Sequence, residues 1–239
     1  MIDRSLNYGR DAIAHFLAET SPKHVVVDLG AGPGTDLLRT RETEPNARLV
    51  AIESDPKLIA LLGKRGIESH ALDIERDRLP LGDGEADAII ANQILEHTKD
   101  IFWVMHEATR VLREGGTLIV GVPNLASLHN RVLLAAGRQP SVIKTDSAHV
   151  RGFTNRDLTD FFESCFPGGY RLEGLRGANF YPLPSAFAKP MAKFFPTLAW
   201  GLMLRFVKTR AYKGGFLHRL DRAGFETNFY RGSGNKPPQ

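Results

Sequence analysis

The residues best suited to chemistry surround one glycine-rich turn. Three valines at 25–27 lead into Asp28, and Gly30, Gly32 and Gly34 follow at intervals of two. A short run rich in valine predicts a strand buried on both faces, as in a parallel sheet. Glycine lacks a Cβ, so the chain can turn sharply there and a ligand can approach its backbone. The stretch therefore predicts a strand, a ligand-binding turn and a helix, the first crossover of a doubly wound fold.

The spacing of the glycines separates two kinds of nucleotide site. In the dinucleotide fingerprint the third glycine comes three residues after the second. Here Gly34 follows Gly32 by two, and Thr35 stands where that glycine would be. This spacing argues against a nicotinamide oxidoreductase. Together with the acid Asp28 at the end of the strand, it resembles motif I of the class I S-adenosylmethionine-dependent methyltransferases.

This resemblance implies roles for the turn and for the chain before it. In that family the acid at the Asp28 position organises the turn and reaches the cofactor's amino group, directly or through water. The backbone of the turn, here including Ala31, lies against the methionine portion and the ribose. A leading helix often closes over the cofactor, and the apolar spacing of residues 5–19 predicts such a helix. Tyr8 and Arg10 in it either touch the cofactor or pack at the surface.

An acid also ends the second predicted strand, residues 48–52. Glu53 lies about twenty residues beyond the turn, where an acid can accept hydrogen bonds from both ribose hydroxyls. We assign Glu53 and the adjoining Ser54 to the cofactor site. Asp55 is the alternative acid, but it precedes Pro56 and is better placed as the N-cap of a helix.

The third and fourth predicted strands end at further candidates. Residues 68–72 lead to Asp73 and Ile74. The resemblance implies that Asp73 binds the adenine amino group and that the Ile74 backbone contacts the ring, although Asp73 is alternatively a loop acid. Asn92 ends the strand 86–92, at the edge where open α/β sheets bind ligands. By resemblance its backbone carbonyl holds the methionine end of the cofactor.

Two histidines are candidates for a catalytic base. His97 follows the fourth strand, and it is either a general base or a residue that holds its loop in place. His149 is the best candidate to face the acceptor, with a loop histidine bonded to backbone as the alternative. Glu96 is expected to be structural. No metal site is expected, because no cluster of Asp, Glu and Asn suggests Mg²⁺ and the single cysteine, Cys165, offers no pair for zinc.

The expected chemistry is an in-line transfer of a methyl group. A hydroxyl acceptor needs a base to take its proton, whereas an amine needs only to arrive neutral, so the histidines favour O-methylation. Residues 123–154 resemble a branch of the family often encoded with cell-surface glycan assembly. We therefore expect transfer from S-adenosyl-L-methionine to a hydroxyl of a small-molecule or glycan-type acceptor, leaving S-adenosyl-L-homocysteine. N-methylation, a lipid or RNA acceptor, and a catalytically silent cofactor-binding protein are the alternatives.

The predicted fold is an α/β, Rossmann-like, doubly wound domain over all 239 residues. Its seven-stranded sheet is mostly parallel and is closed by an antiparallel strand. We assign 170–176 and 225–230 to the antiparallel pair. A helical insertion at 178–224 then precedes the last strand, with a helix near 197–209. Residues 124–150 form a helix and loops on the acceptor side.

The insertion is rich in basic and aromatic residues, and three interpretations stay open. It is a lid over the acceptor pocket, an amphipathic element that contacts a membrane surface through 189–213, or a homodimer interface. Its charge suits an anionic acceptor such as a phosphate-linked sugar or lipid. No RNA-binding motif is present, so nucleic acid is disfavoured as a partner. Its basic residues are Lys189, Lys193, Arg205, Lys208, Arg210, Lys213, Arg219 and Arg222.

Composition indicates an ordinary globular domain. Hydrophobic residues make up 42% of the chain and charged residues 24%, which fits a soluble fold with a sizeable core. A net charge of +4 is too small to imply nucleic acid by itself. A single cysteine fits a reducing compartment and predicts a cytoplasmic location. No run of 18 apolar residues occurs, so no membrane-spanning helix is expected.

Overall fold

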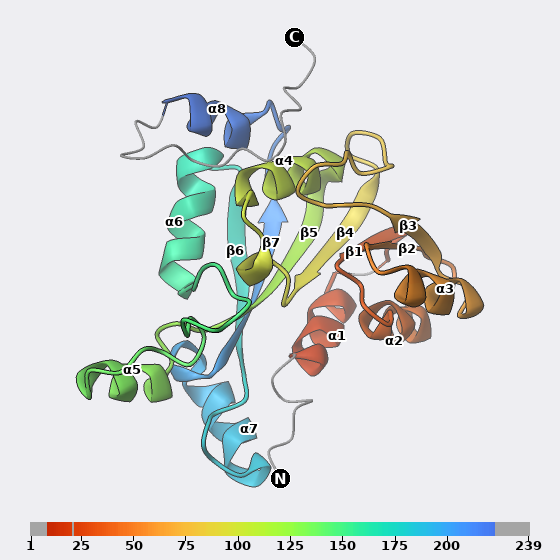
Figure 1. Cartoon of the computed structure of the whole chain (residues 1–239). Helices are drawn as coiled ribbons and strands as arrows, with labels where there is room; N and C mark the ends of the chain where they lie inside the picture. The colour runs from red at the N-terminus through yellow and green to blue at the C-terminus, as the bar shows by residue number, and fades with distance from the viewer. Residues whose placement is uncertain (1–8, 21, 223–239) are drawn as a thin grey trace.

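One seven-stranded sheet organises the protein in the computed structural model, which describes residues 9–20 and 22–222 (Figure 1). The strand order is β3-β2-β1-β4-β5-β7-β6, with β7 antiparallel to both of its neighbours and the other pairs parallel. This order confirms the predicted Rossmann-like, mostly parallel sheet. The strands are β1 Val25–Leu29, β2 Arg48–Glu53, β3 Glu68–Ala71, β4 Ala86–Asn92, β5 Leu112–Pro123, β6 Tyr170–Ala178 and β7 Gly201–Lys208.

Helices cover both faces of this sheet, because successive strand residues point to opposite sides. On β1, Val26 packs in a core with side chains of α1 to α3, while Val27 packs in a second core with side chains of α4, α6 and α8. The helices are α1 Arg10–Ala18, α2 Thr35–Thr43, α3 Pro56–Lys64, α4 Ile101–Val111, α5 Leu128–Ala135, α6 Asn155–Cys165, α7 Ser185–Phe194 and α8 Gly215–Arg222. Two short 3₁₀ turns are η2 Leu95–His97 and η3 Pro196–Leu198.

Local capping fixes where several helices begin. The Asp55 side chain accepts a hydrogen bond from the Lys57 N–H at 2.8 Å, directly before Pro56 at the first position of α3. Asp55 is therefore a helix cap, as the sequence predicted. Thr154 caps α6 in the same way, by accepting from the Asp157 N–H at 3.1 Å.

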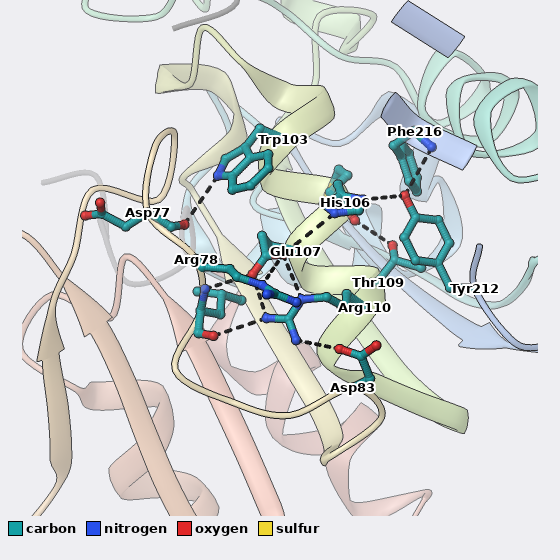
Figure 2. A network of polar contacts seen from close by, with 12 residues as sticks. Asp77, Arg78, Asp83, Trp103, His106, Glu107, Thr109, Arg110, Tyr212 and Phe216 are labelled. Atoms are coloured by element: carbon teal, nitrogen blue, oxygen red, sulfur yellow. Dashed lines mark hydrogen bonds and ion pairs between the residues drawn. The ribbon is translucent and has the colours of Figure 1, made fainter. Parts of the chain in front are cut away.

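A buried ion pair holds the loop before β4 against α4 (Figure 2). Glu107 and Arg110 on α4 are joined at 2.7 Å, and both are buried. Glu107 also accepts from the Leu79 N–H at 2.8 Å, and Arg110 donates to the Leu81 carbonyl at 2.9 Å. The exposed carboxylate of Asp83 adds a contact of 2.8 Å to Arg110. These contacts hold the loop at 79–84 in place.

The predicted helix near 197–209 is wrong: residues 201–208 form strand β7 between β5 and β6. Its side chains are buried almost throughout, since both faces of the sheet are covered by helices and loops there. This segment is mostly apolar, with only Arg205 and Lys208 charged, so it has no period that distinguishes a doubly buried strand from a helix. The antiparallel partner of β6 is thus 201–208. The strand expected at 225–230 lies outside the described residues, as does Tyr8.

The remaining elaborations lie at one end of the sheet. β5 and β6 both run antiparallel to β7, so α5 and α7, which follow them, project from the carboxyl edge of the parallel strands (Figure 1). α7 packs on η3 through a small core of Phe180, Ala188, Ala192 and Ala199. Over the part of the chain that is described, no helix combines the length and the apolar character needed to cross a bilayer.

Candidate active site

The three glycines of the turn after β1 differ in what surrounds them. All three have positive φ: 67° at Gly30, 54° at Gly32 and 77° at Gly34. A Cβ on Gly30 would lie 2.6 Å from the Ile94 side chain, and one on Gly34 would lie 2.5 Å from that of Leu62. A Cβ on Gly32 would meet nothing within 4 Å. Gly30 and Gly34 therefore allow the fold to pack, whereas Gly32 faces open space.

Glu53 is joined to this turn by hydrogen bonds. Its Oε2 accepts from the Gly32 N–H at 2.8 Å, and its Oε1 accepts from the N–H groups of Ser54 and Asp55 at 2.8 and 3.1 Å. The amides of Gly30 and Ala31 in turn donate to the carbonyl of Ile52 on β2. The carboxylate thus lies directly beside the open face of Gly32.

Two buried acids lie beneath the turn. Asp28 on β1 and Asp36 on α2 are only 3% and 8% exposed. Burial raises the pKa of Asp28 well above its ordinary value, and the nearby carboxylates of Asp36 and Glu53 raise it further, opposed by Arg10. Burial also raises the pKa of Asp36, opposed by a hydrogen bond from Asn92 Nδ2 at 3.1 Å and by Arg10, whose Nε is 3.7 Å away. Arg10 and Asn92 therefore lie beside the two buried acids, Asp28 and Asp36.

Asp36 and Gln93 belong to this region and were missed in the sequence. An acid in the first turn of a helix is ordinarily explained by the helix dipole, so Asp36 gave no separate signal. Gln93 follows β4 with a φ of 56°, an uncommon backbone state that often marks a functional site. Its Nε2 is buried, with no hydrogen-bond partner among the described residues. Neither strain nor an unsatisfied donor can be detected before the fold is known.

Asp73 and Ile74 lie at the same edge of the sheet but make contacts of their own. The Leu72 N–H donates to the Glu53 carbonyl at 3.2 Å, which holds the start of this loop beside the end of β2. The Asp73 carboxylate accepts from the Glu75 N–H at 3.0 Å and lies 3.4 Å from Arg76. Ile74 packs against the core. In this structure the Asp73 carboxylate thus makes its contacts within its own loop.

The two candidate histidines are neighbours, although 52 positions separate them. The ring centroids of His97 and His149 are 4.7 Å apart in an edge-to-face arrangement. His149 Nδ1 lies 2.6 Å from the Val142 carbonyl, and His97 Nδ1 lies 3.4 Å from that of Ala148. Burial, and then the proximity of His149, lower the pKa of His97. The neutral imidazole is therefore favoured for His97.

Glu96 lies beside these two histidines, a grouping that was not anticipated from the sequence. One ligand atom from each of Glu96, His97 and His149 lies within 4.8 Å of the other two. Glu96 is 1% exposed, and its Oε2 has no hydrogen-bond partner among the described residues. Burial raises the pKa of its carboxyl to about 7. The sequence analysis sought acid clusters and cysteine pairs, so it did not combine these three residues.

Buried Asn124 connects the elements on the acceptor side. Its Nδ2 donates to the carbonyls of Thr197 and Ala199, both at 2.8 Å, and its own carbonyl accepts from Asn130. Its backbone also forms an isolated bridge to Phe153. The α5 segment, the α7 insertion and the chain around His149 are thus held together.

The basic residues of the insertion do not share one surface. Arg205 and Lys208 lie on β7 and are buried, at 9% and 4% exposure. Lys208 donates to the carbonyls of Thr109 and Leu112, while Arg205 pairs with Glu19 at 3.3 Å. The proposed membrane contact over 189–213 is therefore wrong for the β7 part, because this strand lies inside the sheet.

Comparison with known proteins identifies the central segment. Residues 27–120, from β1 to β5, match the family described as a methyltransferase domain. This segment is therefore similar to methyltransferase domains. A Mycolicibacterium smegmatis relative, named as a probable S-adenosylmethionine-dependent methyltransferase, is 26% identical over 62% of this chain and 51% of its own. A Streptomyces fradiae protein of the transposon Tn4556, named as uncharacterized, is 34% identical over 46% of this chain and 33% of its own.

The solved structures extend the similarity to most of the fold. The Burkholderia thailandensis 1,6-didemethyltoxoflavin-N1-methyltransferase, with S-adenosylhomocysteine bound, has a TM-score of 0.57 at 17% identity. The alignment covers 87% of this chain and 80% of that one, which supports a shared fold. The curated relatives are longer, and this chain spans only about a third to a half of the two described above.

S-adenosylmethionine is the cofactor of the domain, and the turn fits it. The Cβ position of Gly32 is open, so a ligand can lie against this backbone. Glu53 stands beside it as an ionisable acceptor, and the buried acids Asp28 and Asp36 favour a cationic ligand.

Proposed function

We propose that this chain transfers a methyl group from S-adenosyl-L-methionine to a hydroxyl of a small-molecule or glycan-type acceptor. One observation carries the proposal: the open face of Gly32, beyond the carboxyl end of β1, is bordered by Glu53 at the end of β2 and lies near the buried acids Asp28 and Asp36. In open α/β sheets this is the place where ligands bind. When bound, the cofactor supplies a methyl carbon already activated by the positive sulfur.

Each residue of the turn would contact a particular part of the cofactor. The backbone of Gly30, Ala31, Gly32 and Gly34 would lie along it, and Glu53 would exchange its bond from the Gly32 N–H for the ribose hydroxyls. Such bonds to an ionised acceptor contribute about 1.5–3 kcal/mol each. The adjoining Ser54 donates its N–H to Glu53 and so fixes the carboxylate.

Further residues complete the cofactor site. Asp28 and Arg10 would bind the amino and carboxylate groups of the methionine portion, with the Asn92 carbonyl beside them. Asp73 and Ile74 would bind the adenine, which requires Asp73 to leave Arg76. Because a cation favours the ionised form of a carboxyl, cofactor binding would lower the raised pKa of Asp28 and release a proton.

The acceptor would lie on the side of His97 and His149. With its Nδ1 facing the Val142 carbonyl, His149 presents Nε2 as the nitrogen that can accept a proton. A base at this point supports a hydroxyl acceptor, whose proton must leave near the transition state. The fold neighbour from Burkholderia thailandensis is named as an N1-methyltransferase, so the atom that receives the methyl group has to be measured.

His149→Ala tests this role. We expect turnover of a hydroxyl acceptor to fall by about 10²–10⁴-fold, the usual contribution of a positioned base. The affinity for S-adenosylhomocysteine should stay unchanged, because the cofactor turn does not include His149. Unchanged turnover would assign His149 to the support of its loop alone.

The exposed side chains of α7 support an acceptor that lies at an anionic membrane surface on the cytoplasmic side. Phe187 and Phe194 on this helix are 65% and 73% exposed, and Lys189 and Lys193 lie between them in the sequence. Aromatic and basic side chains on one amphipathic helix are typical of interfacial binding. Only α7, and not the range 189–213, would make this contact.

Vesicle sedimentation tests the α7 contact. We expect the protein to sediment with vesicles containing phosphatidylglycerol and not with pure phosphatidylcholine, and Phe187→Ser with Phe194→Ser to abolish it. Equal sedimentation of the double variant would contradict the proposal. A concentration-dependent dimer that the double variant loses, with no vesicle binding, would assign the same surface to a homodimer.

A further inference from the structure

We propose that Glu96, His97 and His149 bind one divalent transition-metal cation of the kind that imidazole and carboxylate ligands favour, such as Zn²⁺. The three residues come from η2 and from the loop before α6, and each offers one ligand atom within 4.8 Å of the others. Two imidazoles and one carboxylate form a common ligand set for zinc and for iron.

The segments that hold the three side chains are tied together. The Val150 N–H donates to the Glu96 carbonyl at 2.8 Å, which fixes η2 against the chain around His149. Metal bonds of about 2.1 Å in a tetrahedron place ligand atoms about 3.4 Å apart. The side chains therefore need to approach one another by at most about 1.4 Å when an ion binds.

The second nitrogens of both histidines are arranged as in metal sites. Each Nδ1 faces a backbone carbonyl, that of Val142 at 2.6 Å for His149 and that of Ala148 at 3.4 Å for His97. Ligating histidines almost always donate their other ring N–H to a carbonyl, carboxylate or water, which fixes the tautomer. This arrangement leaves Nε2 of each ring with a lone pair for the ion.

Glu96 supplies an independent observation. Its side chain is almost completely buried, yet Oε2 accepts no hydrogen bond. A buried polar atom without a partner costs about 1–3 kcal/mol, and more if it is charged. A cation held between Glu96 and the two imidazoles would give that oxygen its missing partner.

Three protein ligands leave coordination positions open. η2 follows β4, and the last residue of β4, Asn92, donates a hydrogen bond to the buried Asp36 beside the proposed cofactor site. An open position would therefore be available to water or to an oxygen of the acceptor. This last point rests on the proposed methyl transfer to a hydroxyl, whereas binding of the ion does not. A bound ion would occupy the Nε2 lone pair of His149, so the imidazole would act as the base only in the metal-free site.

Cobalt is a suitable probe, because Co²⁺ bound by imidazole and carboxylate absorbs visible light. The chelator-treated, desalted full chain would be titrated with Co²⁺, followed by displacement with Zn²⁺. We expect one Co²⁺ per chain and complete displacement. His97→Ala and His149→Ala should each weaken binding beyond the ~10–100-fold loss typical for an outer partner of a metal ligand.

His70→Ala is the matched control, because His70 lies 2.9 Å from Glu68 on β3 and forms another histidine–glutamate pair. The His70→Ala variant should bind Co²⁺ like the wild type. The Glu96→Gln variant should bind Co²⁺ weakly, without a loss of packing. S-adenosylhomocysteine affinity and the melting temperature establish that each variant is folded. Absence of Co²⁺ and Zn²⁺ binding by the wild type, or binding that survives His97→Ala and His149→Ala, would overturn the metal site and leave the cofactor site untouched.

Discussion

Substitution of Gly32 is the sharpest way to separate ligand binding from folding in the glycine turn. Gly32 and Gly66 have similar positive φ values, 54° and 64°, and a Cβ added to either would meet nothing within 4 Å. A left-handed backbone costs an L-residue about 1–2 kcal/mol. Gly32→Ala and Gly66→Ala should therefore lose similar stability.

Only Gly32 faces the proposed cofactor, so the two variants should differ in binding. An extra methyl group in a packed contact costs about 1–3 kcal/mol. At about 1.4 kcal/mol per factor of ten, this is a loss of roughly 5- to 150-fold in affinity for S-adenosylhomocysteine. Gly32→Val adds a branched side chain and should abolish binding.

Calorimetric titration with S-adenosylhomocysteine measures the affinity, and thermal unfolding measures the stability. Gly66→Ala should bind like the wild type. If Gly32→Ala binds with undiminished affinity, or if Gly66→Ala loses as much, the turn does not contact the ligand as proposed.

Four further variants test the electrostatics and packing. Because burial raises the pKa of Asp28, the native state keeps a proton that the unfolded chain releases, so stability falls as pH rises above the ordinary value of 3.8 towards the native pKa. Asp28→Asn should thus raise the melting temperature at neutral pH, seen by calorimetry, while weakening S-adenosylhomocysteine binding; an unchanged melting temperature at every pH would contradict this. Gly34→Ala should lower the melting temperature, because its Cβ would lie 2.5 Å from a leucine side chain on α3. Glu107→Ala should cost about 3–5 kcal/mol in urea unfolding by removing the buried carboxylate that neutralises Arg110, whereas the exposed position of Asp83 makes Asp83→Ala cost at most about 1 kcal/mol; equal losses would refute this ranking.

The first half of the chain could be predicted because its signals are local. The valine run, the glycine spacing and Glu53 each act through the backbone near them, and the structure brings Glu53 to within 2.8 Å of the Gly32 N–H. The cap at Asp55 follows from the same kind of short-range chemistry. For these residues, sequence neighbours are also the partners that decide the conformation.

The rest depends on contacts between distant segments. β7 has a mostly apolar sequence without a clear period, and only pairing with β5 and β6 makes it a strand. Glu96 and His149 meet through the docking of a loop onto η2, which no spacing rule describes. Asp73 has the residue type that the family resemblance requires, but in the structure its carboxylate bonds within its own loop.

The central claim is that the glycine turn of this chain binds S-adenosylmethionine. Calorimetric titration of the full chain with S-adenosylhomocysteine, with reduced nicotinamide dinucleotide as the control ligand, tests it most directly. We predict micromolar or tighter binding of the nucleoside and no binding of the dinucleotide. Absence of nucleoside binding, or tight binding of the dinucleotide in its place, would contradict the account.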